Sequence, residues 1–346
     1  MNAVKLGIHI TGWLDEHEHS EYSILFEQLT KEYNANTPTI DIFSATVAAA
    51  AGCFPLVGKG NKYAVDAAAV EAMRHMLVGA EFGGVVVIGE GEKDHAPMLF
   101  NGELIGQGQP IEWDIAVDPV DGTALAARGD EGAVSVMAAA DRGAMLDCSQ
   151  VYYMKKIITG PAGWGVVDID ASPTQNIHAL AAALGRDVSE VRVAVIDKPR
   201  NAEVIAEVQA AGAEWLQFAE GDVAMGVAAA TENSGVDMLL GVGGAPEGVA
   251  TACAVRVLGG FMQARLAPQD VDQLEQAMAA GYDLERKYAL TDLVGGEHWV
   301  FVLTGITDGL LTKGIEVEGD GLILQSLVLD SKLGEPQLIE VEVGRD

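Results

Sequence analysis

Apolar positions recur at helical spacing in the region that follows residue 38. Between residues 39 and 80 the chain is rich in alanine, and Val70, Met73 and Leu77 fall on one helical face. The glycine-containing stretch "LVGKGNKYAVD" (56–66) interrupts this pattern. We therefore expect two helices here, separated by a turn.

Two β-branched runs come next, and each is followed by acidic residues and glycine. "GGVVVIGEGE" (83–92) and "DIAVDPVDGT" (114–123) have the composition of buried strands that end in sharp turns. Further on, "GAVSVMAAADRGAML" (132–146) predicts a hairpin with "DRG" as its turn. This region therefore supplies strands whose ends carry carboxylates.

The pattern changes beyond about residue 185, where short apolar runs alternate with amphipathic helical segments. Such an alternation indicates a sheet with helices on its faces. Residues 1–38 differ again, because they are rich in histidine, glutamate and aromatic residues and end in the loop sequence "NANTPT". We expect three parts: an appended N-terminal segment (1–38), a first lobe (39–185) and a second α/β lobe (186–346).

Composition is that of a soluble protein with a full core. Of the 346 residues, 49% are hydrophobic, yet no uninterrupted apolar run approaches the roughly 20 residues that cross a bilayer. The best candidate, residues 44–58, is short and contains Gly52 and Pro55. The early run "WLDEHEHSE" is unlike a secretory signal or a transit peptide. Three widely spaced cysteines fit a reducing compartment, so we expect a cytoplasmic protein.

The formal net charge is −30, from 51 acidic and 21 basic residues. A charge of this size repels nucleic acids and anionic membrane surfaces, so we expect neither as a partner. One metal site takes only a handful of carboxylates. Most of the acidic residues are therefore expected on a solvated surface, and a few remain to bind a cation.

The two acidic strand ends supply candidate metal ligands. In α/β folds, ligands collect at the carboxyl ends of strands, so the expected group is Glu90, Glu92, Asp114, Asp118 and Asp121. Carboxylates this close need a counter-charge, and a hard divalent cation such as Mg²⁺ or Mn²⁺ supplies it. The alternative is that Asp-Pro and Asp-Gly are ordinary turn dipeptides. The second acidic strand end favours the metal site.

The turn after the second acidic strand suits an anion. Pro119 fixes the backbone between Asp118 and Asp121, Gly122 lets the backbone approach a ligand, and Thr123 can open a helix whose N–H groups face an anion. A metal cluster beside such an anion site indicates hydrolysis of a phosphate ester.

Eight stretches of the chain resemble, in order, the signature blocks of one enzyme family. They are "VGKGNKYAVDAAAVEAMR", "VVIGEGEKDHAPMLF", "IAVDPVDGT", "YMKKIITGP", "KPRNAEVIAEVQ", "EGDVA", "GVGGAPEGVATA" and "TGITDGLL". The family is the class II (GlpX-type) fructose-1,6-bisphosphatases, some of which also use sedoheptulose 1,7-bisphosphate. The likeness runs from about residue 39 to the low 310s, and leaves out the first 38 residues and the C-terminal tail.

The resemblance implies a fold, a chemistry and a set of site residues. The fold is α/β, with alternating helix and sheet layers (an αβαβα sandwich), two lobes and the active site between them. The activity is that of a lithium-sensitive sugar phosphatase of gluconeogenesis or the Calvin cycle, which uses Mn²⁺ or Mg²⁺ and forms homodimers or homotetramers. The implied metal ligands are Asp66, Glu90, Asp118, Asp121 and Glu247. The implied substrate contacts are Asp121, Gly122, Thr123, Tyr153, Arg200, Asn201, Ala202, Glu220, Gly221, Asp222 and Gly244.

Two positions depart from the family pattern. Class II enzymes usually carry glutamate where this chain has Asp121, so the shorter side chain is expected to shift one metal. Asn61 stands where an acidic residue is common after "GKG". Both departures bear on metal preference and on the level of activity.

Few cations are available to bind an anionic substrate. "YMKK" (153–156) and Arg200 stand at the ends of predicted strands. Arg200 can bind the phosphate that is not cleaved through its planar donors. Lys155 and Lys156 either bind the substrate or solvate a strand edge. The ring of Tyr153 either contacts the sugar or packs in the core.

"GVGGAPEGV" (241–249) follows a predicted strand and opens a helix, as a dinucleotide-binding motif does. Its glycine spacing differs from that motif, and Glu247 would stand where a pyrophosphate binds. A nicotinamide enzyme is therefore not expected. Glu247 fits better as a metal ligand from the second lobe that closes the cleft between the lobes. The other interpretation is that these glycines only allow close packing.

The combined hypothesis is hydrolysis of the 1-phosphate ester by direct attack of a metal-activated water. The catalytic residues are then Glu90 and Thr123, which orient or deprotonate the water, and Asp118, which holds metal. Arg200 and Tyr153 anchor the rest of the substrate. Two alternatives stay open: an inositol or other sugar monophosphatase, since "DPVDGT" belongs to that wider group, and a catalytically silent sugar-phosphate sensor.

Overall fold

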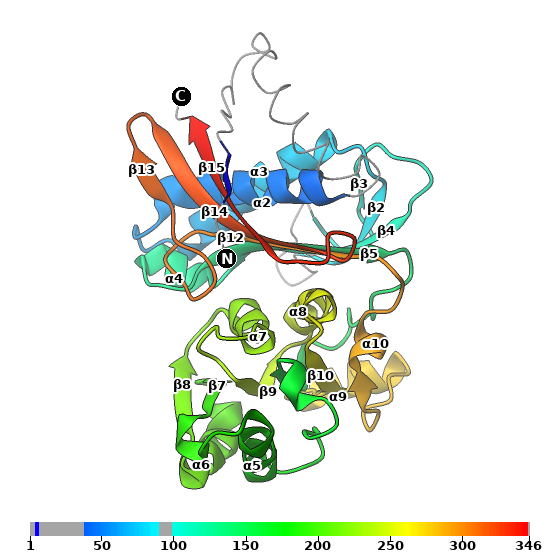
Figure 1. Ribbon diagram of the computed structural model, residues 1–346. Coiled ribbons are helices and arrows are strands. Elements are labelled where there is room, and N and C mark those ends of the chain that lie inside the picture. Colours follow the sequence, from blue (N-terminus) through cyan, green and yellow to red (C-terminus); the bar gives the residue numbers. More distant parts are fainter. Residues whose placement is uncertain (1–3, 7–37, 90–98, 345–346) are drawn as a thin grey trace.

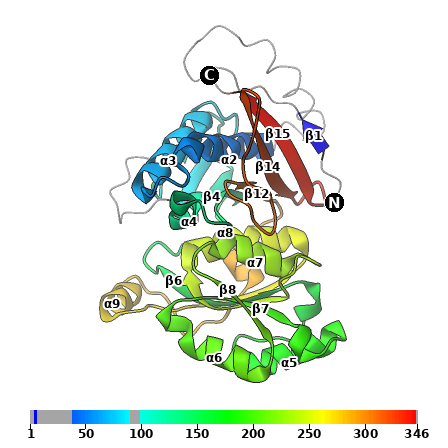
Figure 2. The ribbon, with the colours of Figure 1, turned by 90° about the vertical axis from the view of Figure 1, so that its left-hand side faces the viewer.

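Helix layers and sheet layers alternate in the protein, which a computed structural model describes over residues 4–6, 38–89 and 99–344 (Figure 1). Within these ranges, helices α2 and α3 cover the outer face of a nine-stranded sheet. Helices α7 and α8 lie between this sheet and a six-stranded one, whose far face is covered by α5 and α6 (Figure 2). The expected αβαβα layering is confirmed.

The alanine-rich region forms the two expected helices, α2 (Thr39–Cys53) and α3 (Lys62–Val78). Asn61 caps α3, because its side chain accepts a hydrogen bond of 3.2 Å from the N–H of Ala64. Asparagine is among the best N-cap residues. The departure from the family pattern at this position therefore has a local structural role.

Helix α2 belongs to the core. The window Thr39–Leu56 is the one helical stretch in the described part of the chain that is long and apolar enough to cross a membrane, and 61% of it is buried. It packs against α3 and against strands of the first sheet. Burial of this kind is typical of the core helix of a layered domain.

The first sheet has the strand order β1-β15-β14-β12-β5-β4-β2-β3, with β13 paired to β14. The predicted acidic strands are confirmed as β2 and β4, which pair in parallel. The strand bounds are β1 Val4–Leu6, β2 Gly84–Ile88, β3 Leu104–Ile105, β4 Trp113–Asp121, β5 Val134–Asp141, β12 Trp299–Gly305, β13 Glu316–Glu318, β14 Gly321–Asp330 and β15 Gln337–Gly344.

The hairpin expected at "DRG" is wrong. Strand β5 pairs antiparallel with β4 on one side and with β12 on the other. After the turn the chain forms a single bridge, from Met145 to Val294, and then enters the second sheet. Both edges of β5 are taken by strands distant from this turn, so the local turn signal could not reveal its partners.

The second sheet has the order β11-β10-β6-β9-β7-β8. Strands β7, β8 and β9 are parallel, and β6 and β10 run antiparallel to their neighbours. The strand bounds are β6 Tyr153–Thr159, β7 Arg192–Ile196, β8 Glu214–Phe218, β9 Met238–Gly244, β10 Phe261–Leu266 and β11 Tyr288–Ala289. The helix bounds are α4 Thr123–Arg128, α5 Pro173–Leu184, α6 Ala202–Ala211, α7 Asp222–Ala230, α8 Ala245–Leu258, α9 Val271–Ala279 and α10 Leu290–Leu293.

Sheet membership does not follow the boundary expected at residues 185 and 186. Strand β6, from the first part of the chain, lies in the second sheet. Strands β12 to β15, from the end of the chain, return to the first sheet. The division into lobes at 39–185 and 186–346 therefore stays a prediction, and the two sheets exchange segments across it.

Small apolar side chains fill the space between the two sheets. One buried cluster joins Ala138 and Ala140 of β5 to Val227 of α7 and to Ala252 and Val255 of α8. Small side chains let the helix layer pack closely on the sheet. The ends of β4 and the starts of α7 and α8 are thereby brought to the same level of the molecule.

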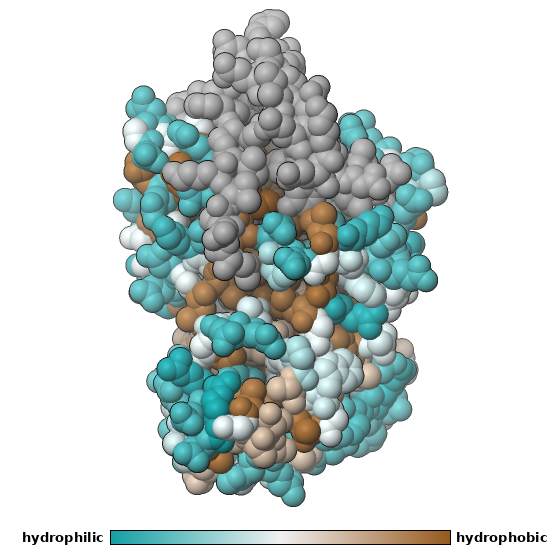
Figure 3. Space-filling view, in the orientation of Figure 1, coloured by the Kyte–Doolittle hydropathy of each residue, from teal (hydrophilic) through white to brown (hydrophobic). Residues whose placement is uncertain are grey.

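The charge lies mostly outside the core, as expected. Among the described residues the buried acidic side chains are Glu103, Asp114, Asp121, Asp222 and Asp330. On the face shown in Figure 3, hydrophilic residues cover much of the upper and lower parts, and hydrophobic residues gather where the two parts meet.

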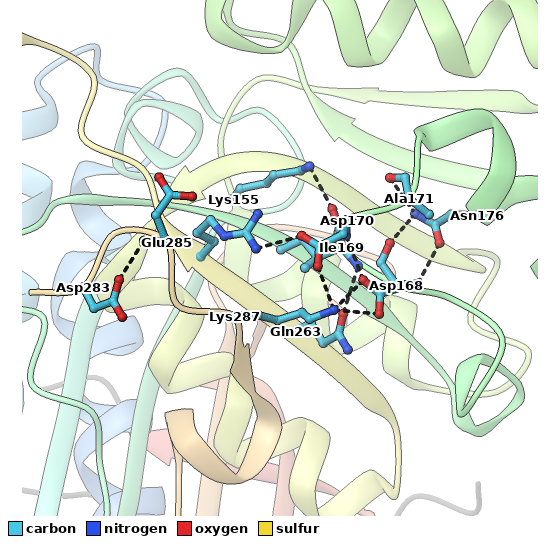
Figure 4. Close-up of polar contacts among 11 residues, drawn as sticks. Lys155, Asp168, Ile169, Asp170, Ala171, Asn176, Gln263, Asp283, Glu285 and Lys287 are labelled. Atoms are coloured by element: carbon cyan, nitrogen blue, oxygen red, sulfur yellow. Dashed lines mark hydrogen bonds and ion pairs between the residues drawn. The ribbon is translucent and has the colours of Figure 1, made fainter.

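An ion-pair network fixes the loop before α5 to the second sheet (Figure 4). The Nζ atom of Lys287 lies 2.8 Å from both carboxylate oxygens of Asp168 and 2.8 Å from Asp170. Arg265 of β10 donates to Asp170 at 2.7 Å, and Lys155 of β6 donates to the carbonyl of Ile169 at 2.9 Å. The loop is therefore held by side chains from three separate segments.

Replacing Lys287 by methionine is expected to lower the melting temperature at pH 7 by roughly 1–3 °C. Lys287 lowers the pKa of Asp168 and of Asp170, and both carboxylates raise the pKa of Lys287. The stabilisation is thus present above the unfolded pKa of aspartate and below that of lysine, and is lost as pH falls through the folded aspartate pKa values.

Thermal melts at pH 7 and pH 3, in low and high salt, check this expectation. The difference between variant and wild type should shrink at pH 3 and in high salt, because these pairs are largely exposed. A difference that is the same under all four conditions would show that packing, and not charge, supplies it.

Candidate active site

The end of strand β4 is built as a sharp turn into a helix. The strand has a register shift between Asp118 and Asp121, and Gly122 follows with φ +85°, a conformation that favours glycine. Helix α4 begins at Thr123, whose hydroxyl donates to the carbonyl of Val120 at 2.9 Å. The expected opening of a helix at Thr123 is confirmed.

Asp121 is the buried carboxylate where α4 and α7 begin. Its Oδ2 accepts a hydrogen bond of 3.0 Å from the N–H of Val223, in the first turn of α7. Burial raises the pKa of Asp121 to about 7, and the charges of Glu247 and Asp222 add to the rise. Three carboxylates from β4, α7 and α8 therefore lie close enough to repel one another.

Glu247 reaches this place from the first turn of α8. Its carboxylate lies against Gly244, where a Cβ atom would stand only 1.8 Å from Oε2. Gly244 itself has an ordinary φ of −64°. Glycine is required here by the space that the Glu247 side chain occupies, and not by backbone conformation.

Lys156 is the buried cation among these acids. Its side chain is 1% exposed, and Nζ lies 2.5 Å from Oδ2 of Asp222. The same Nζ donates to the carbonyl of Gly244 at 3.1 Å. The strand-edge interpretation of Lys155 and Lys156 is wrong, because β6 lies inside the sheet between β10 and β9.

A signal for Lys156 was present in the sequence. Consecutive residues of a strand point to opposite faces of the sheet, so one of the two lysines had to enter the space between the layers. Sequence alone could not show which of them it was.

These carboxylates fit a divalent cation by charge and chemistry. Asp121, Asp222 and Glu247 supply oxygen donors, and Lys156 balances only one of their three negative charges. Hard cations such as Mg²⁺ and Mn²⁺ prefer carboxylate oxygens. Within residues 4–6, 38–89 and 99–344, no three side chains of His, Cys, Asp and Glu are close enough to form a complete metal site.

The other expected metal ligands come from different segments. Asp66 lies on α3, near Cys53 of α2; burial raises the pKa of that thiol, and the charge of Asp66 adds to the rise. Asp118 is half-buried on β4, opposite Val136 of β5. Glu90, and Glu92 beside it, lie outside the described residues. The proposed ligand set is therefore drawn from helices, a strand and the segment after β2.

Asp114 does not belong to this group, and its expected place there is wrong. It stands seven positions before Asp121 on β4, which corresponds to roughly 23 Å along a strand. Asp114 is buried and accepts from Arg142 at 2.5 Å and from the N–H of Met145 at 3.1 Å. Its role is to fix the turn after β5.

Tyr153 and Arg200 lie side by side near Gly244. Tyr153 is half-buried and pairs with Gly244 across β6 and β9. The guanidinium carbon of Arg200 lies 4.7 Å from the centre of the Tyr153 ring, a cation–π contact. The Nε of Arg200 donates to the carbonyl of Val242 at 2.9 Å. The guanidinium is thereby oriented by the end of β9.

Asn201 holds the backbone around Arg200. Its Nδ2 donates to the carbonyls of Ile196 and Val242, and its Oδ1 accepts from the N–H of Val242 at 2.8 Å. The side chain also lies against Gly241, where a Cβ would meet Oδ1 at 2.8 Å. The side-chain amide of this expected substrate contact is thus engaged by backbone groups.

Of the remaining expected substrate contacts, Glu220 and Gly221 lie beside the starts of α4 and α7, and Ala202 lies at the start of α6. Glu220 accepts a hydrogen bond of 3.1 Å from the N–H of Ala124 at the start of α4. Gly221 adopts φ +89° directly before α7. Ala202 is exposed at the first position of α6. The start of α4 and the start of α7 are therefore joined through Glu220.

Comparison with known proteins agrees, over most of the chain, with the family resemblance seen in the sequence. The profile described as "Bacterial fructose-1,6-bisphosphatase, glpX-encoded" matches residues 36–343. The chain belongs to this family. Fructose-1,6-bisphosphatase class 2 of Haemophilus influenzae is 39% identical over 306 residues, which cover 85% of this chain and 92% of that protein. Fructose-1,6-bisphosphatase 2 class 2 of Escherichia coli is 40% identical over 301 residues, covering 83% and 94%.

The family match corrects one boundary. The C-terminal tail was expected to lie outside the family, but the match extends to residue 343. This segment forms β13, β14 and β15 of the first sheet. Residues 1–35 fall outside the match.

Proposed function

We propose that this protein hydrolyses the 1-phosphate of fructose 1,6-bisphosphate. The relatives named above carry this activity in their names, and the chain spans more than nine tenths of each. The observation that supports the proposal most directly is that Asp121 and Glu247, from different layers, lie close enough to repel each other. Lys156 contacts the residue that caps the helix of Glu247, and Arg200 is held by the end of β9. Acidic and basic groups of this kind suit a cation and a phosphorylated sugar at one place.

The acidic residues divide into two roles in this proposal. Asp121, Glu247, Asp66, Asp118 and Glu90 would hold the divalent cation, Mn²⁺ or Mg²⁺, on which this class of phosphatase depends. When bound, such a cation neutralises charge on a phosphoryl group and makes a water more acidic. Glu90 and Thr123 would orient or deprotonate the attacking water.

The substrate is held by groups on the second sheet. Arg200, oriented by Val242 and Tyr153, would bind the phosphate that is not cleaved through its planar donors. Tyr153 would pack against the sugar. The starts of α4 and α7, with Gly122, Gly221 and Asp222, would surround the phosphate that leaves.

Phosphate release from purified protein tests this function. We expect turnover of fructose 1,6-bisphosphate with Mn²⁺ or Mg²⁺, loss of turnover in EDTA, and no turnover by Asp118→Asn. Sedoheptulose 1,7-bisphosphate, fructose 6-phosphate and inositol 1-phosphate are tested as further substrates in the same assay. Turnover of the monophosphates but not of the bisphosphates would assign the protein to the monophosphatases. A folded protein that binds sugar phosphate and releases none from any substrate would be a sensor.

Replacing Arg200 by alanine is expected to raise KM for fructose 1,6-bisphosphate by roughly 10- to 100-fold, with kcat within about threefold. The reason is that Arg200 contacts the part of the substrate that does not react. Arg186, which pairs with Asp237 on the surface, offers a matched control, and Arg186→Ala should leave KM unchanged. A fall in kcat at constant KM would contradict the anchoring role.

The setting of this activity is also part of the proposal. We infer a cytoplasmic enzyme of gluconeogenesis or the Calvin cycle that acts as a homodimer or homotetramer, with no nucleic-acid or membrane partner. The formal charge of −30 supports the last point. Analytical ultracentrifugation of the full chain measures the oligomeric state.

A further inference from the structure

Lys156 links two helix starts that carry the acidic groups of the site. Its Nζ contacts Asp222, the first residue of α7, at 2.5 Å and the carbonyl of Gly244, which caps α8, at 3.1 Å. Its side chain is 1% exposed. One ammonium group thus connects helices that are otherwise separate in the chain.

Each of the two groups that Lys156 contacts is next to a group that touches an expected metal ligand. On the α7 side, the N–H of Val223, next to Asp222, donates to Asp121 at 3.0 Å. On the α8 side, the carboxylate of Glu247 lies against Gly244. The positions of Asp121 and Glu247 relative to each other therefore depend on the Lys156 link as well as on the packing of α7 against α8.

We propose that Lys156 is a positioning residue, which sets the spacing of Asp121 and Glu247 for the cation by joining the start of α7 to the start of α8. This inference rests on the proposed function for its role in turnover, but not for its effect on the two carboxylates. A lysine that served only to neutralise charge would need Asp222 alone, whereas this one also bonds a neutral carbonyl. Groups that orient metal ligands typically change metal affinity or activity by about 10- to 100-fold when they are lost.

A charge-neutralising role and a positioning role of Lys156 predict opposite changes in Mn²⁺ affinity when the lysine is removed. Removing a positive charge from a group of carboxylates strengthens their attraction for a cation. Removing a positioning contact weakens cation binding, because the ligands no longer share one geometry. Isothermal titration of full-length protein with Mn²⁺ alone, after EDTA treatment, separates these outcomes without any substrate.

The positioning role is tested with two variants of Lys156 and one control variant. Lys156→Met removes the charge and both contacts, and Lys156→Arg keeps the charge in a longer, planar group that does not reproduce the two contacts of the ammonium. Lys155→Met is the control, because Lys155 is the neighbouring residue of the same strand and donates instead to the carbonyl of Ile169. Folding is followed by circular dichroism and thermal melting.

We expect the Kd for Mn²⁺ to rise at least about tenfold in Lys156→Met and about three- to tenfold in Lys156→Arg. In the phosphate-release assay, kcat should fall about 100-fold in Lys156→Met, with KM for fructose 1,6-bisphosphate within about threefold. Lys155→Met should match wild type in both measurements.

Other outcomes overturn the inference. An unchanged or lower Kd in folded Lys156→Met assigns Lys156 a charge role only. If Lys156→Met does not fold, the Kd of Lys156→Arg for Mn²⁺ becomes the test. A wild-type Kd in that variant would show that the geometry of the contacts made by Lys156 is unimportant. Absence of turnover by wild type would remove the proposed function, while the Mn²⁺ titrations would still decide the role of Lys156.

Discussion

Asp121→Asn is expected to lower kcat for fructose 1,6-bisphosphate at least about 1000-fold and, in metal-free protein, to raise stability. The activity is lost because asparagine removes one negative charge where the proposed cation and the leaving phosphate meet. The fold is kept because asparagine has nearly the same shape and its Oδ1 can still accept the hydrogen bond from Val223.

The gain in stability follows from the pKa of Asp121. Burial and the charges of Glu247 and Asp222 raise this pKa from 3.8 to about 7. Because the folded pKa lies above the unfolded one, the stability that the protonated acid confers is lost as pH rises from about 4 to 7. The free energy of unfolding of metal-free Asp121→Asn should therefore exceed that of wild type by about 4 kcal/mol at pH 8 and by little at pH 4.

Urea titrations in EDTA at both pH values, with phosphate release measured in Mn²⁺, test the two expectations together. Stability gained where activity is lost is the usual sign of a functional carboxylate. An Asp121→Asn variant that is less stable than metal-free wild type at pH 8 would show that the carboxylate is a structural acceptor. Near-normal turnover by the same variant would remove Asp121 from the site.

Gly244→Ala is expected to lower kcat about 100-fold while leaving the melting temperature within a few degrees of wild type. The added Cβ would stand 1.8 Å from Oε2 and 2.3 Å from Cδ of Glu247, so this carboxylate has to move. Alanine fits the backbone, because φ at this position is −64°. The clash is with the end of a flexible side chain, which can turn aside at small cost.

Gly248→Ala is the matched control for this variant. It lies one turn further along α8, where a Cβ would meet the sulfur of Met154 at 2.5 Å and no carboxylate is among its nearest neighbours. Its expected effect is a loss of stability with little loss of kcat, since methionine adapts to crowding. If Gly244→Ala also kept wild-type kcat and wild-type affinity for Mn²⁺, the position of Glu247 would be irrelevant to the reaction.

The acidic strand end was correctly predicted from local sequence. The apolar run before Asp118, the proline after it and the glycine at 122 are short-range signals, and they describe β4, its turn and the start of α4 as observed. Such signals suffice because turn geometry depends on the φ values that a few adjacent residues can adopt. The two alanine-rich helices were also predicted correctly, because helical spacing of apolar residues is a local signal as well.

The layered fold was predicted by resemblance, whereas the one strand pairing expected from the sequence, the hairpin at "DRG", is wrong. Strands β12 to β15 return to the first sheet from the end of the chain, and β5 pairs with β12 across more than 150 positions. The partner of a strand is chosen by burial of its two faces against other layers. A single sequence shows which face is apolar but not which strand will lie beside it.

Within the site, the sequence named the types of group and the folded chain sorted them. Asp114 and Asp121 are the same residue type on one strand, yet they lie at opposite ends of β4, and Asp114 pairs with Arg142. Lys155 and Lys156 are adjacent and identical, yet only Lys156 enters the space between the sheets. The sequence determines which charged groups are present. Their partners depend on which layers pack against each strand, and those layers come together only when distant segments of the chain assemble.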